Sequence, residues 1–315
     1  MSIKIAQSLA LRMASLHGGA RNYAAGWCSP RHHYYSWVVS AMQAMASYGN
    51  VHLYADDEAA RLLVDTFGIP YDSVSICPEQ AGLPTRVWVA SKLQAFRRLV
   101  DAGEPFLHID GDVFLFGRLP SSIENAAVVA QNPEDERCHP VYHMYTVAKR
   151  NLLTRLPKVP YSWLSVPTDY AYNMGLFGGQ DMAAMAKYVE EAETVLYSPE
   201  NAAAWRHIAT LPEEQQWSFN YPIEQYALHA AAEAAGFRVT TLFDRETICS
   251  GGHERESSFL HALVDKRAKP APGSLTYRLE RRLENNWPEM KRRVDDWIGD
   301  QPSAPARDTA VSAAA

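Results

Sequence analysis

Short apolar runs alternate along the chain with longer stretches in which apolar residues recur at helical spacing. The runs Ile3–Leu9, Val51–Tyr54 and Pro105–Ile109 predict buried strands, because a strand covered on both faces reads as a continuous apolar segment. Between them, Tyr34–Tyr48 and Thr85–Ala102 carry one apolar face each and predict helices. Strands that alternate with helices predict a Rossmann-like α/β fold, a sheet flanked by helices.

The rest of the chain yields further elements from the same signals. They are a helix over Glu58–Phe67, a strand over Ala126–Gln131, irregular chain over Asn132–His143 and Tyr161–Tyr172, a helix capped by Asp181, another opened by Ser198 and Pro199, a helix from Ile223 to Gly236, a strand over Phe237–Phe243, and a charged helix over Tyr277–Ile298.

A change in composition after residue 268 predicts the domain organisation. We expect a single main domain over residues 1–268, a linker and C-terminal helix over 269–300, and a flexible Pro, Ser and Ala-rich tail over 301–315. The C-terminal helix can pack on the main domain or form a homodimer, and the sequence does not choose between them.

Composition excludes some classes of protein. The 315 residues are 47% hydrophobic and 21% charged, with a formal net charge of −6. An acidic chain without a basic stripe is not expected to bind nucleic acid. No segment reaches membrane-spanning length. The four cysteines, widely spaced, indicate reduced thiols rather than a disulfide framework, so we expect a cytoplasmic protein.

The first sign of chemistry is the pair Asp110 and Asp112, which follows the strand Pro105–Ile109 directly. Side chains alternate in extended backbone, so the two carboxylates point the same way, and Gly111 lets another group approach between them. Two carboxylates with room for further oxygen ligands suit Mg²⁺ or Mn²⁺ better than zinc. The alternative is a solvated turn that ends a strand.

This Asp-x-Asp resembles the signature of metal-dependent GT-A fold glycosyltransferases, in which two acids hold a metal against the diphosphate of a nucleotide-sugar. The phrase PFLHIDGDVF also resembles an uncharacterised bacterial family of glycosyltransferase-like proteins. The resemblance covers residues 34–267 as a series of ordered motifs. It implies a GT-A type mixed sheet, a nucleotide-diphosphate-sugar donor, and an acceptor (glycan, peptide or small molecule) that the sequence does not identify.

The resemblance suggests donor-binding residues before and after the Asp-x-Asp. Asp56 and Asp57 follow the second strand, where an acid can meet the base or ribose; an N-cap with first-turn acids explains them equally well. Lys92 lies in the helix before the Asp-x-Asp strand, near the end of the sheet where Asp110 is expected, and can reach a donor phosphate or hydroxyl. The alternative is a lysine that extends to water.

Two later motifs match the acceptor side of the resembled enzymes. Asn173-Met174-Gly175 followed by apolar residues and paired glycines implies a surface on which a sugar lies, although a tight turn uses the same residues. Glu224, with Gln225 as substitute, is the candidate general base or the group that stabilises positive charge on the sugar. An acid in the first turn of a helix can instead be a structural feature.

The segment Phe259–Arg267 resembles the closing motif of metal-dependent GT-A enzymes, with Ala262 as a departure from the pattern. The resemblance implies that His261 completes the metal shell and that Lys266 meets the diphosphate. A mixed oxygen and nitrogen set favours Mn²⁺ over Mg²⁺. His253 competes with His261 for this role, and either histidine can be merely structural.

Two other functions compete with a glycosyltransferase. A sugar-phosphate nucleotidyltransferase also uses a metal ion held by acids, but it normally has a Gly-rich loop with a lysine after the first strand. Here the loop His17–Pro30 contains glycines and Arg21 but no lysine. A catalytically silent binding module would keep the fold, and its activity in cells would not change when Asp110 is replaced by alanine.

Overall fold

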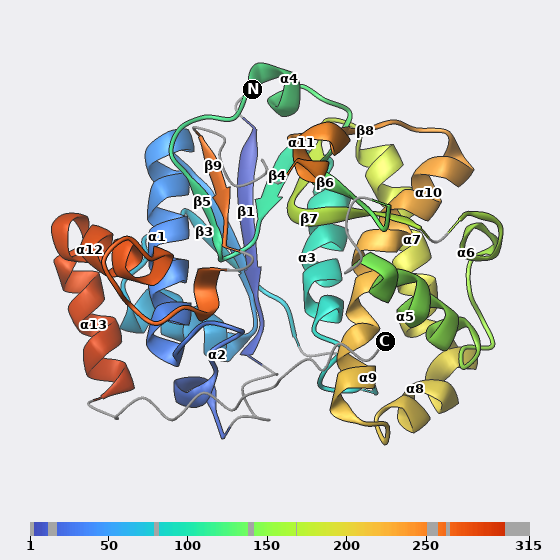
Figure 1. Ribbon diagram of the computed structural model, residues 1–315, viewed down its shortest axis with the longest axis horizontal. Helices are drawn as coiled ribbons and strands as arrows, with labels where there is room; N and C mark the ends of the chain where they lie inside the picture. Colours follow the sequence, from blue (N-terminus) through green and yellow to red (C-terminus); the bar gives the residue numbers. More distant parts are fainter. Residues whose placement is uncertain are drawn as a thin grey trace.

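The computed structural model describes residues 3–11, 18–78, 82–137, 142–167, 169–250, 258–262 and 265–299. A mixed seven-stranded sheet has the order β3-β2-β1-β4-β7-β6-β8, and β5 and β9 form a second, two-stranded sheet (Figure 1). The strands are β1 (Lys4–Leu9), β2 (Val51–Ala55), β3 (Ser73–Ile76), β4 (Phe106–Ile109), β5 (Val113–Leu115), β6 (Val128–Asp135), β7 (Tyr170–Gly179), β8 (Val239–Thr241) and β9 (Phe259–His261).

The first half of the sheet has the order of a Rossmann half. Strands β3, β2, β1 and β4 are parallel, so their carboxyl ends lie at one edge. Because the chain moves outward from β1 to β2 and β3 and then returns to the other side of β1, the strand order reverses between β1 and β4. In open α/β sheets this switch point is where ligands bind. The predicted α/β sheet flanked by helices is therefore confirmed.

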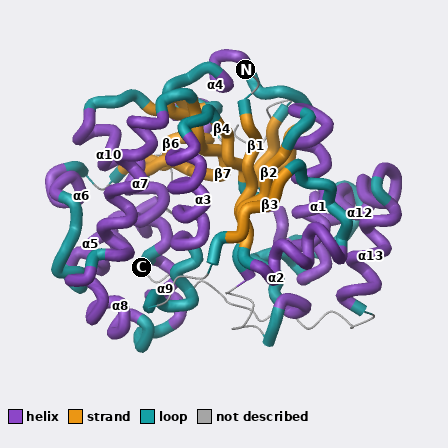
Figure 2. Tube along the Cα trace, turned by 180° about the vertical axis from the view of Figure 1, so that it is seen from behind, coloured by secondary structure: helices purple, strands orange, loops and turns teal. Residues whose placement is uncertain are grey.

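Helices cover both faces of the sheet (Figures 1 and 2). Ile5 packs on the α1 side with Ala44, whereas the adjacent Ala6 packs on the α3 side with Phe96, as alternation along a strand requires. The helices are α1 (Pro30–Tyr48), α2 (Asp57–Ala60), α3 (Val89–Ala102), α4 (Ser121–Glu124), α5 (His143–Leu153), α6 (Tyr161–Ser165), α7 (Met182–Tyr197), α8 (Ala202–Ile208), α9 (Glu213–Ser218), α10 (Ala227–Ala235), α11 (Arg245–Cys249), α12 (Leu275–Asn286) and α13 (Pro288–Ile298).

Local sequence signals set the ends of several helices. Ser29 caps α1 by accepting from the His32 backbone N–H, Pro30 occupies the first turn, and Gly49 ends the helix at a positive φ of 86°. Asp181 caps α7 as predicted, since its Oδ1 accepts from the Ala184 N–H at 3.0 Å. These helices therefore begin where their capping residues indicate.

Strand β7 contains a bulge that reaches toward the end of β4. Its pairing with β6 passes from Ala130↔Phe177 to Asn132↔Asn173, so Met174–Leu176 lie opposite Gln131 alone. The Gly175 carbonyl accepts from the Asp110 N–H at 3.0 Å. Bulges turn backbone and side chains away from the regular ladder and are frequent beside active sites.

Several predicted elements differ in the structure, among them the helix expected from Tyr34, which begins at Pro30. Strand β6 continues to Asp135, because Asn132–Asp135 pair with β7, and Tyr161–Tyr172 is not loop throughout but contains α6 and the start of β7. Helix α3 begins at Val89 rather than after Thr85. The C-terminal helix is two helices, because Pro288 disfavours helical backbone at Trp287, whose φ and ψ are −140° and 55°.

Helices α12 and α13 pack against α1 in one apolar cluster, in which Leu279, Leu283 and Val294 are buried. His32 Nε2 lies 3.0 Å from Glu280 Oε1, and the Arg31 guanidinium pairs with Asp295. Of the two alternatives predicted for this segment, the described residues show packing on the main domain. The predicted tail, residues 301–315, lies outside the described residues.

No helix among the described residues has the length and apolar content needed to cross a bilayer. Cys28 and Cys77 carry free thiols, whereas Cys249 is disulfide-bonded. The expectation of reduced cysteines throughout is therefore wrong for Cys249. Since disulfides persist mainly in oxidising compartments, the cysteines no longer support a cytoplasmic location.

Candidate active site

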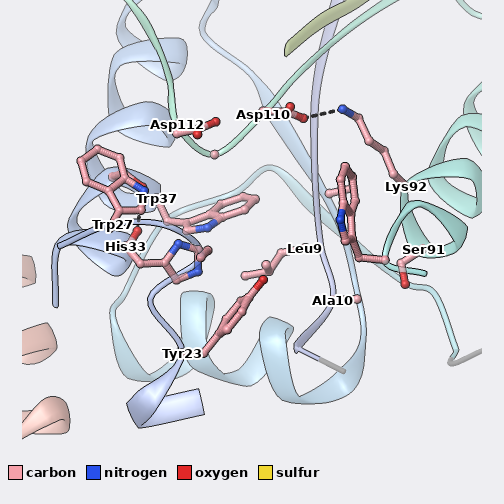
Figure 3. Close-up of a pocket in the computed structure, with 15 residues that line it drawn as sticks. Leu9, Ala10, Tyr23, Trp27, His33, Trp37, Ser91, Lys92, Asp110 and Asp112 are labelled. Atoms are coloured by element: carbon pink, nitrogen blue, oxygen red, sulfur yellow. Dashed lines mark hydrogen bonds and ion pairs between the residues drawn. The ribbon is translucent and has the colours of Figure 1, made fainter. Parts of the chain in front are cut away.

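A cleft opens at the switch point between β1 and β4 (Figure 3). Its walls come from the chain after β1, the first half of α1, the start of α3 and the turn after β4. The residues that line it are Ser8, Leu9, Ala10, Tyr23, Ala25, Trp27, His33, Ser36, Trp37, Trp88, Ser91, Lys92, Asp110, Gly111 and Asp112. The predicted Asp-x-Asp therefore lies in a cleft at the edge of the sheet where ligands are expected.

The turn that carries Asp110 and Asp112 is fixed by close packing. A Cβ atom built on Gly111 would lie 2.2 Å from Cε2 of Trp37, so only glycine leaves room for the indole ring. Val113 donates its N–H back to the Asp110 carbonyl at 3.0 Å and begins β5. The two aspartates are thus held on a turn whose shape depends on the ring beneath it.

The C-terminal segment brings a histidine and a lysine to Asp112. Strand β9 pairs with β5, and Val113 lies opposite His261. His261 Nε2 is 3.3 Å from Asp112 Oδ1, and Lys266 Nζ donates to Asp112 Oδ2 at 2.8 Å. Burial opposes ionisation of Asp112, but Lys266 and His261 outweigh it and hold the pKa of its carboxyl well below the usual range. Asp112 is therefore an anion over the ordinary pH range.

Asp110, Asp112 and His261 form a set that fits a divalent cation. One oxygen from each carboxylate and one imidazole nitrogen all lie within 4.8 Å of one another. Oxygen ligands suit Mg²⁺ and Mn²⁺, and the nitrogen ligand adds preference for Mn²⁺. The alternative metal-binding residue, His253, lies outside the described residues.

Lys92 lines the cleft beside Asp110 and is buried (Figure 3). Its Nζ donates to Asp110 Oδ1 at 2.7 Å, to Glu224 Oε1 at 2.5 Å and to the Met174 carbonyl at 3.0 Å. Burial alone would lower the pKa of Lys92, but Asp110 and Glu224 raise it, so the side chain carries a positive charge. Lys92 does not extend to water, as one interpretation had it, but joins the two carboxylates.

Glu224 is 2% exposed and lies in a π-helical segment, Pro222–Tyr226, that leads into α10. Burial raises the pKa of its carboxyl to about 7, against the opposing effect of Lys92. A carboxyl group with a pKa near neutral can exchange a proton at physiological pH. The side-chain oxygen of the adjacent Gln225 is buried without a hydrogen-bond partner among the described residues.

A family model matches residues 3–297. The chain belongs to DUF6734, a family of unknown function. No curated protein matches this DUF6734 sequence. Among solved structures, it is similar to the apo crystal structure of mouse xyloside xylosyltransferase 1, with a TM-score of 0.37 and 10% sequence identity over 85% of this chain and 100% of that chain. Similarity at this level does not identify an activity.

In this DUF6734 chain, Asn173 is buried and uses its amide for internal contacts. Its Nδ2 donates to Glu134 Oε1 at 2.8 Å, and its Oδ1 accepts from the Gly175 N–H at 2.9 Å. The amide therefore supports the β7 bulge next to Asp110. Asn173 is not among the residues that line the cleft.

Asp56 and Asp57 differ in their surroundings. Asp56 caps α2, since its Oδ1 accepts from the Ala59 N–H at 2.7 Å, and its Oδ2 accepts from the Leu11 N–H at 2.6 Å. Asp57 is exposed in the first turn of the same helix. Asp56 thus stabilises the chain that follows β1, and neither residue lines the cleft.

Three site residues were not predicted. Gln131 accepts from His261 at 2.7 Å, Glu134 bonds Asn173 and the Tyr145 hydroxyl, and His33 lines the cleft with its pKa lowered by burial to about 3. The available signal was a polar run at the end of an apolar strand: Gln131 was expected as the last residue of that strand, and Glu134 in the irregular chain after it. His33 lies in the first turn of α1, before the predicted helix Tyr34–Tyr48, and the sequence offered no signal for it.

Proposed function

We propose that this protein is a metal-dependent glycosyltransferase that moves a sugar from a nucleotide-diphosphate-sugar donor to an acceptor yet to be identified. The observation that supports the proposal is the meeting of Asp110, Asp112 and His261 at the cleft between β1 and β4. The motifs that resemble GT-A enzymes agree with it. When bound, Mn²⁺ or Mg²⁺ supplies positive charge that stabilises the leaving diphosphate.

Charge balance at the site favours an anionic ligand. Lys92 pairs with Asp110 and Glu224, and Lys266 pairs with Asp112, so two lysines offset two anions when Glu224 is protonated and face three when it is ionised. A divalent cation held by the same aspartates therefore leaves an excess of positive charge at the mouth of the cleft. A diphosphate carries the complementary charge, and Lys266 is placed to donate to it.

The aromatic side chains of the cleft suit the rest of the donor. Tyr23, Trp27, Trp37 and Trp88 line it, and the first two come from the glycine and aromatic-rich loop after β1 (Figure 3). Flat rings can stack against a nucleotide base at little entropic cost. We assign base and ribose to this wall rather than to Asp56, because both carboxylate oxygens of Asp56 already accept backbone N–H groups.

Glu224 is the proposed group that accepts a proton from the acceptor hydroxyl or stabilises positive charge on the sugar. Lys92 contacts Glu224 and Asp110 together, so it fixes the position of the carboxyl relative to the metal-binding turn. Gln225 and Asn173 stay proposed neighbours of the sugar, with Asn173 acting through the β7 bulge. The pKa of about 7 lets Glu224 both take and return a proton.

A thermal-shift screen of nucleotide-sugars with and without Mn²⁺ tests the proposal. A donor present at a hundred times its Kd should raise the free energy of unfolding by about 2.7 kcal/mol. We expect the shift to require Mn²⁺ in the wild type and to vanish in Asp110→Asn and Asp112→Asn. Asp101→Asn, which removes a surface partner of Arg97, is the matched control and should respond like the wild type.

Turnover then separates this activity from its rivals. A glycosyltransferase releases nucleoside diphosphate from the donor that shifts the melt, whereas a nucleotidyltransferase releases pyrophosphate from a nucleoside triphosphate. A silent binding module shows the shift but no release. Absence of any Mn²⁺-dependent shift across the screen would refute the donor assignment.

A further inference from the structure

The buried side chain of Gln131 forms a hydrogen bond with one ring nitrogen of His261, and the other ring nitrogen faces Asp112. His261 Nδ1 lies 2.7 Å from Gln131 Oε1, while Nε2 faces Asp112. Gln131 is 1% exposed and the adjacent Asn132 2% exposed. A buried amide without hydrogen bonds destabilises the fold, so the bonds of this pair determine which atom faces the histidine.

The direction of these bonds is set at one end by a backbone carbonyl. The Pro133 carbonyl can only accept, so the group 3.0 Å from it must be the Asn132 Nδ2. Asn132 Oδ1 then accepts from Gln131 Nε2 at 2.9 Å, which turns Gln131 Oε1 toward His261. An amide oxygen can only accept, so the proton between Gln131 and His261 belongs to Nδ1 of the ring.

The contact between Gln131 and His261 requires glycine at position 175, because a side chain there would overlap both groups. A Cβ atom on Gly175 would lie 2.5 Å from Gln131 Oε1 and 2.5 Å from His261 Nδ1. Gly175 belongs to the β7 bulge, which lies opposite Gln131. The Gly175 carbonyl accepts a hydrogen bond from the Asp110 N–H. The bulge therefore brings the Gln131 contact and the Asp110 turn together at one glycine.

We propose that Gln131 is a positioning residue that places the ring proton of His261 on Nδ1 and so directs Nε2, as the metal-binding nitrogen, toward Asp110 and Asp112. Asn132 and the Pro133 carbonyl fix the orientation of the Gln131 amide. Groups of this kind orient metal-binding histidines, and their loss typically weakens metal binding about 10-fold to 100-fold. The metal in this inference rests on the proposed function, but the position of the proton does not.

Nitrogen-15 NMR of the histidine side chains tests the proton without metal. At a pH of about 8, above the ordinary pKa of histidine, the wild type should show a ring proton on Nδ1 of His261. The resonance is assigned by its absence in His261→Gln. It should be lost or shifted in Gln131→Met, which keeps the length of the side chain and removes its acceptor. A wild-type His261 that carries its proton on Nε2 alone would overturn the inference.

Mn²⁺ titration, followed by electron paramagnetic resonance of the free ion, tests the consequence. We expect Gln131→Met to bind Mn²⁺ about 10-fold to 100-fold more weakly, and Gln131→Glu, which keeps an acceptor, to stay closer to the wild type. Gln43→Met is the matched control: Gln43 is also buried, but its amide lies beside Arg282 of α12. It should bind Mn²⁺ like the wild type.

The outcomes separate this inference from the proposed function. Equal Mn²⁺ affinity in Gln131→Met and the wild type would refute the positioning role and leave the proposed function standing. Absence of Mn²⁺ binding by the wild type would refute the metal in both, while the NMR experiment still decides where the proton lies. If Gln131→Met does not fold, the wild-type resonance and Gln131→Glu decide the question.

Discussion

Lys92 and Glu224 form a buried pair whose charges depend on each other and on Asp110. Lys92 donates to Glu224 at 2.5 Å and to Asp110 at 2.7 Å, but its single positive charge balances only one of the two carboxylates when both are ionised. Burial favours the neutral form of Glu224 and raises its pKa to about 7. The stability of this site therefore depends on pH in the neutral range.

The contribution of Glu224 to the free energy of unfolding should fall as the pH rises through this range. The pKa of Glu224 rises from its ordinary 4.5 to about 7 on folding, so between these values the folded protein holds a proton that the unfolded chain releases. The stabilisation is complete below pH 4.5 and lost as the pH passes 7, in total about 3 kcal/mol.

Denaturant unfolding of the wild type and Glu224→Gln at several pH values measures this effect. Since the glutamine does not titrate, its stability relative to the wild type should increase by about 3 kcal/mol from pH 4.5 to 7. Glu193→Gln, which removes a partner of Arg97 on a surface helix, should keep the wild-type pH profile. Parallel profiles for the wild type and Glu224→Gln would show that the carboxyl titrates normally.

At the scale of residues, sequence reasoning found the groups that carry recognisable motifs. Asp110, Asp112, His261 and Lys266 follow apolar strands in a familiar order, and the structure places them together. Gln131 was expected at the end of a strand and Glu134 in irregular chain, and their contacts could not be predicted because they depend on the pairing of β6 with β7. Lys92 was predicted near Asp110, but its contact with Glu224 depends on the packing of α3 against Pro222–Tyr226.

Among the elements, the turn between β4 and β5 depends most on one neighbour, the Trp37 ring of α1. Gly111→Ala should cost about 1–3 kcal/mol of stability, because the added methyl group overlaps a ring that α1 holds in place. It should also weaken Mn²⁺ binding, since Asp110 and Asp112 lie on either side. Gly117→Ala is the matched control, because Gly117 lies just after β5 and its Cβ would meet nothing within 4 Å.

Thermal unfolding and Mn²⁺ titration of the two alanine variants check this prediction. A Gly111→Ala protein as stable as Gly117→Ala, with unchanged Mn²⁺ affinity, would mean that the turn tolerates the displacement and that the ring does not position the aspartates.

The boundaries of elements could be predicted where the signal is local. Gly49 and Asp181 mark helix ends through a left-handed glycine and a cap, whereas the helix expected from Tyr34 begins at Pro30, after the cap Ser29. The start of α3 could not be predicted in this way, because the Val89 N–H donates to Asn220, which is 131 residues away in sequence. The continuation of β6 depends likewise on its pairing with β7.

For the whole molecule, the C-terminal helices are part of the same apolar cluster as α1 and β2. Leu283 is fully buried in this cluster, so Leu283→Ala should destabilise the protein by about 2–5 kcal/mol. Leu164→Ala, at a leucine that is 63% exposed, should change stability by less than about 0.5 kcal/mol.

Denaturant unfolding followed by both far-UV circular dichroism and tryptophan fluorescence measures these values. A single transition in the wild type is expected if α12 and α13 unfold with the main domain. A separate early transition, removed by Leu283→Ala without loss of the main one, would instead support an independent C-terminal unit beginning after residue 268.

The partners of Asp112 come from a late part of the chain: Lys266 is 154 positions further on. A ribosome therefore releases the parallel half of the sheet and both aspartates well before the histidine and lysine that complete the site. A polypeptide interrupted before residue 258 retains the two acids but lacks His261 and Lys266, which contact Asp112. The contacts of Asp112 are therefore complete only after residue 266 has been added to the chain.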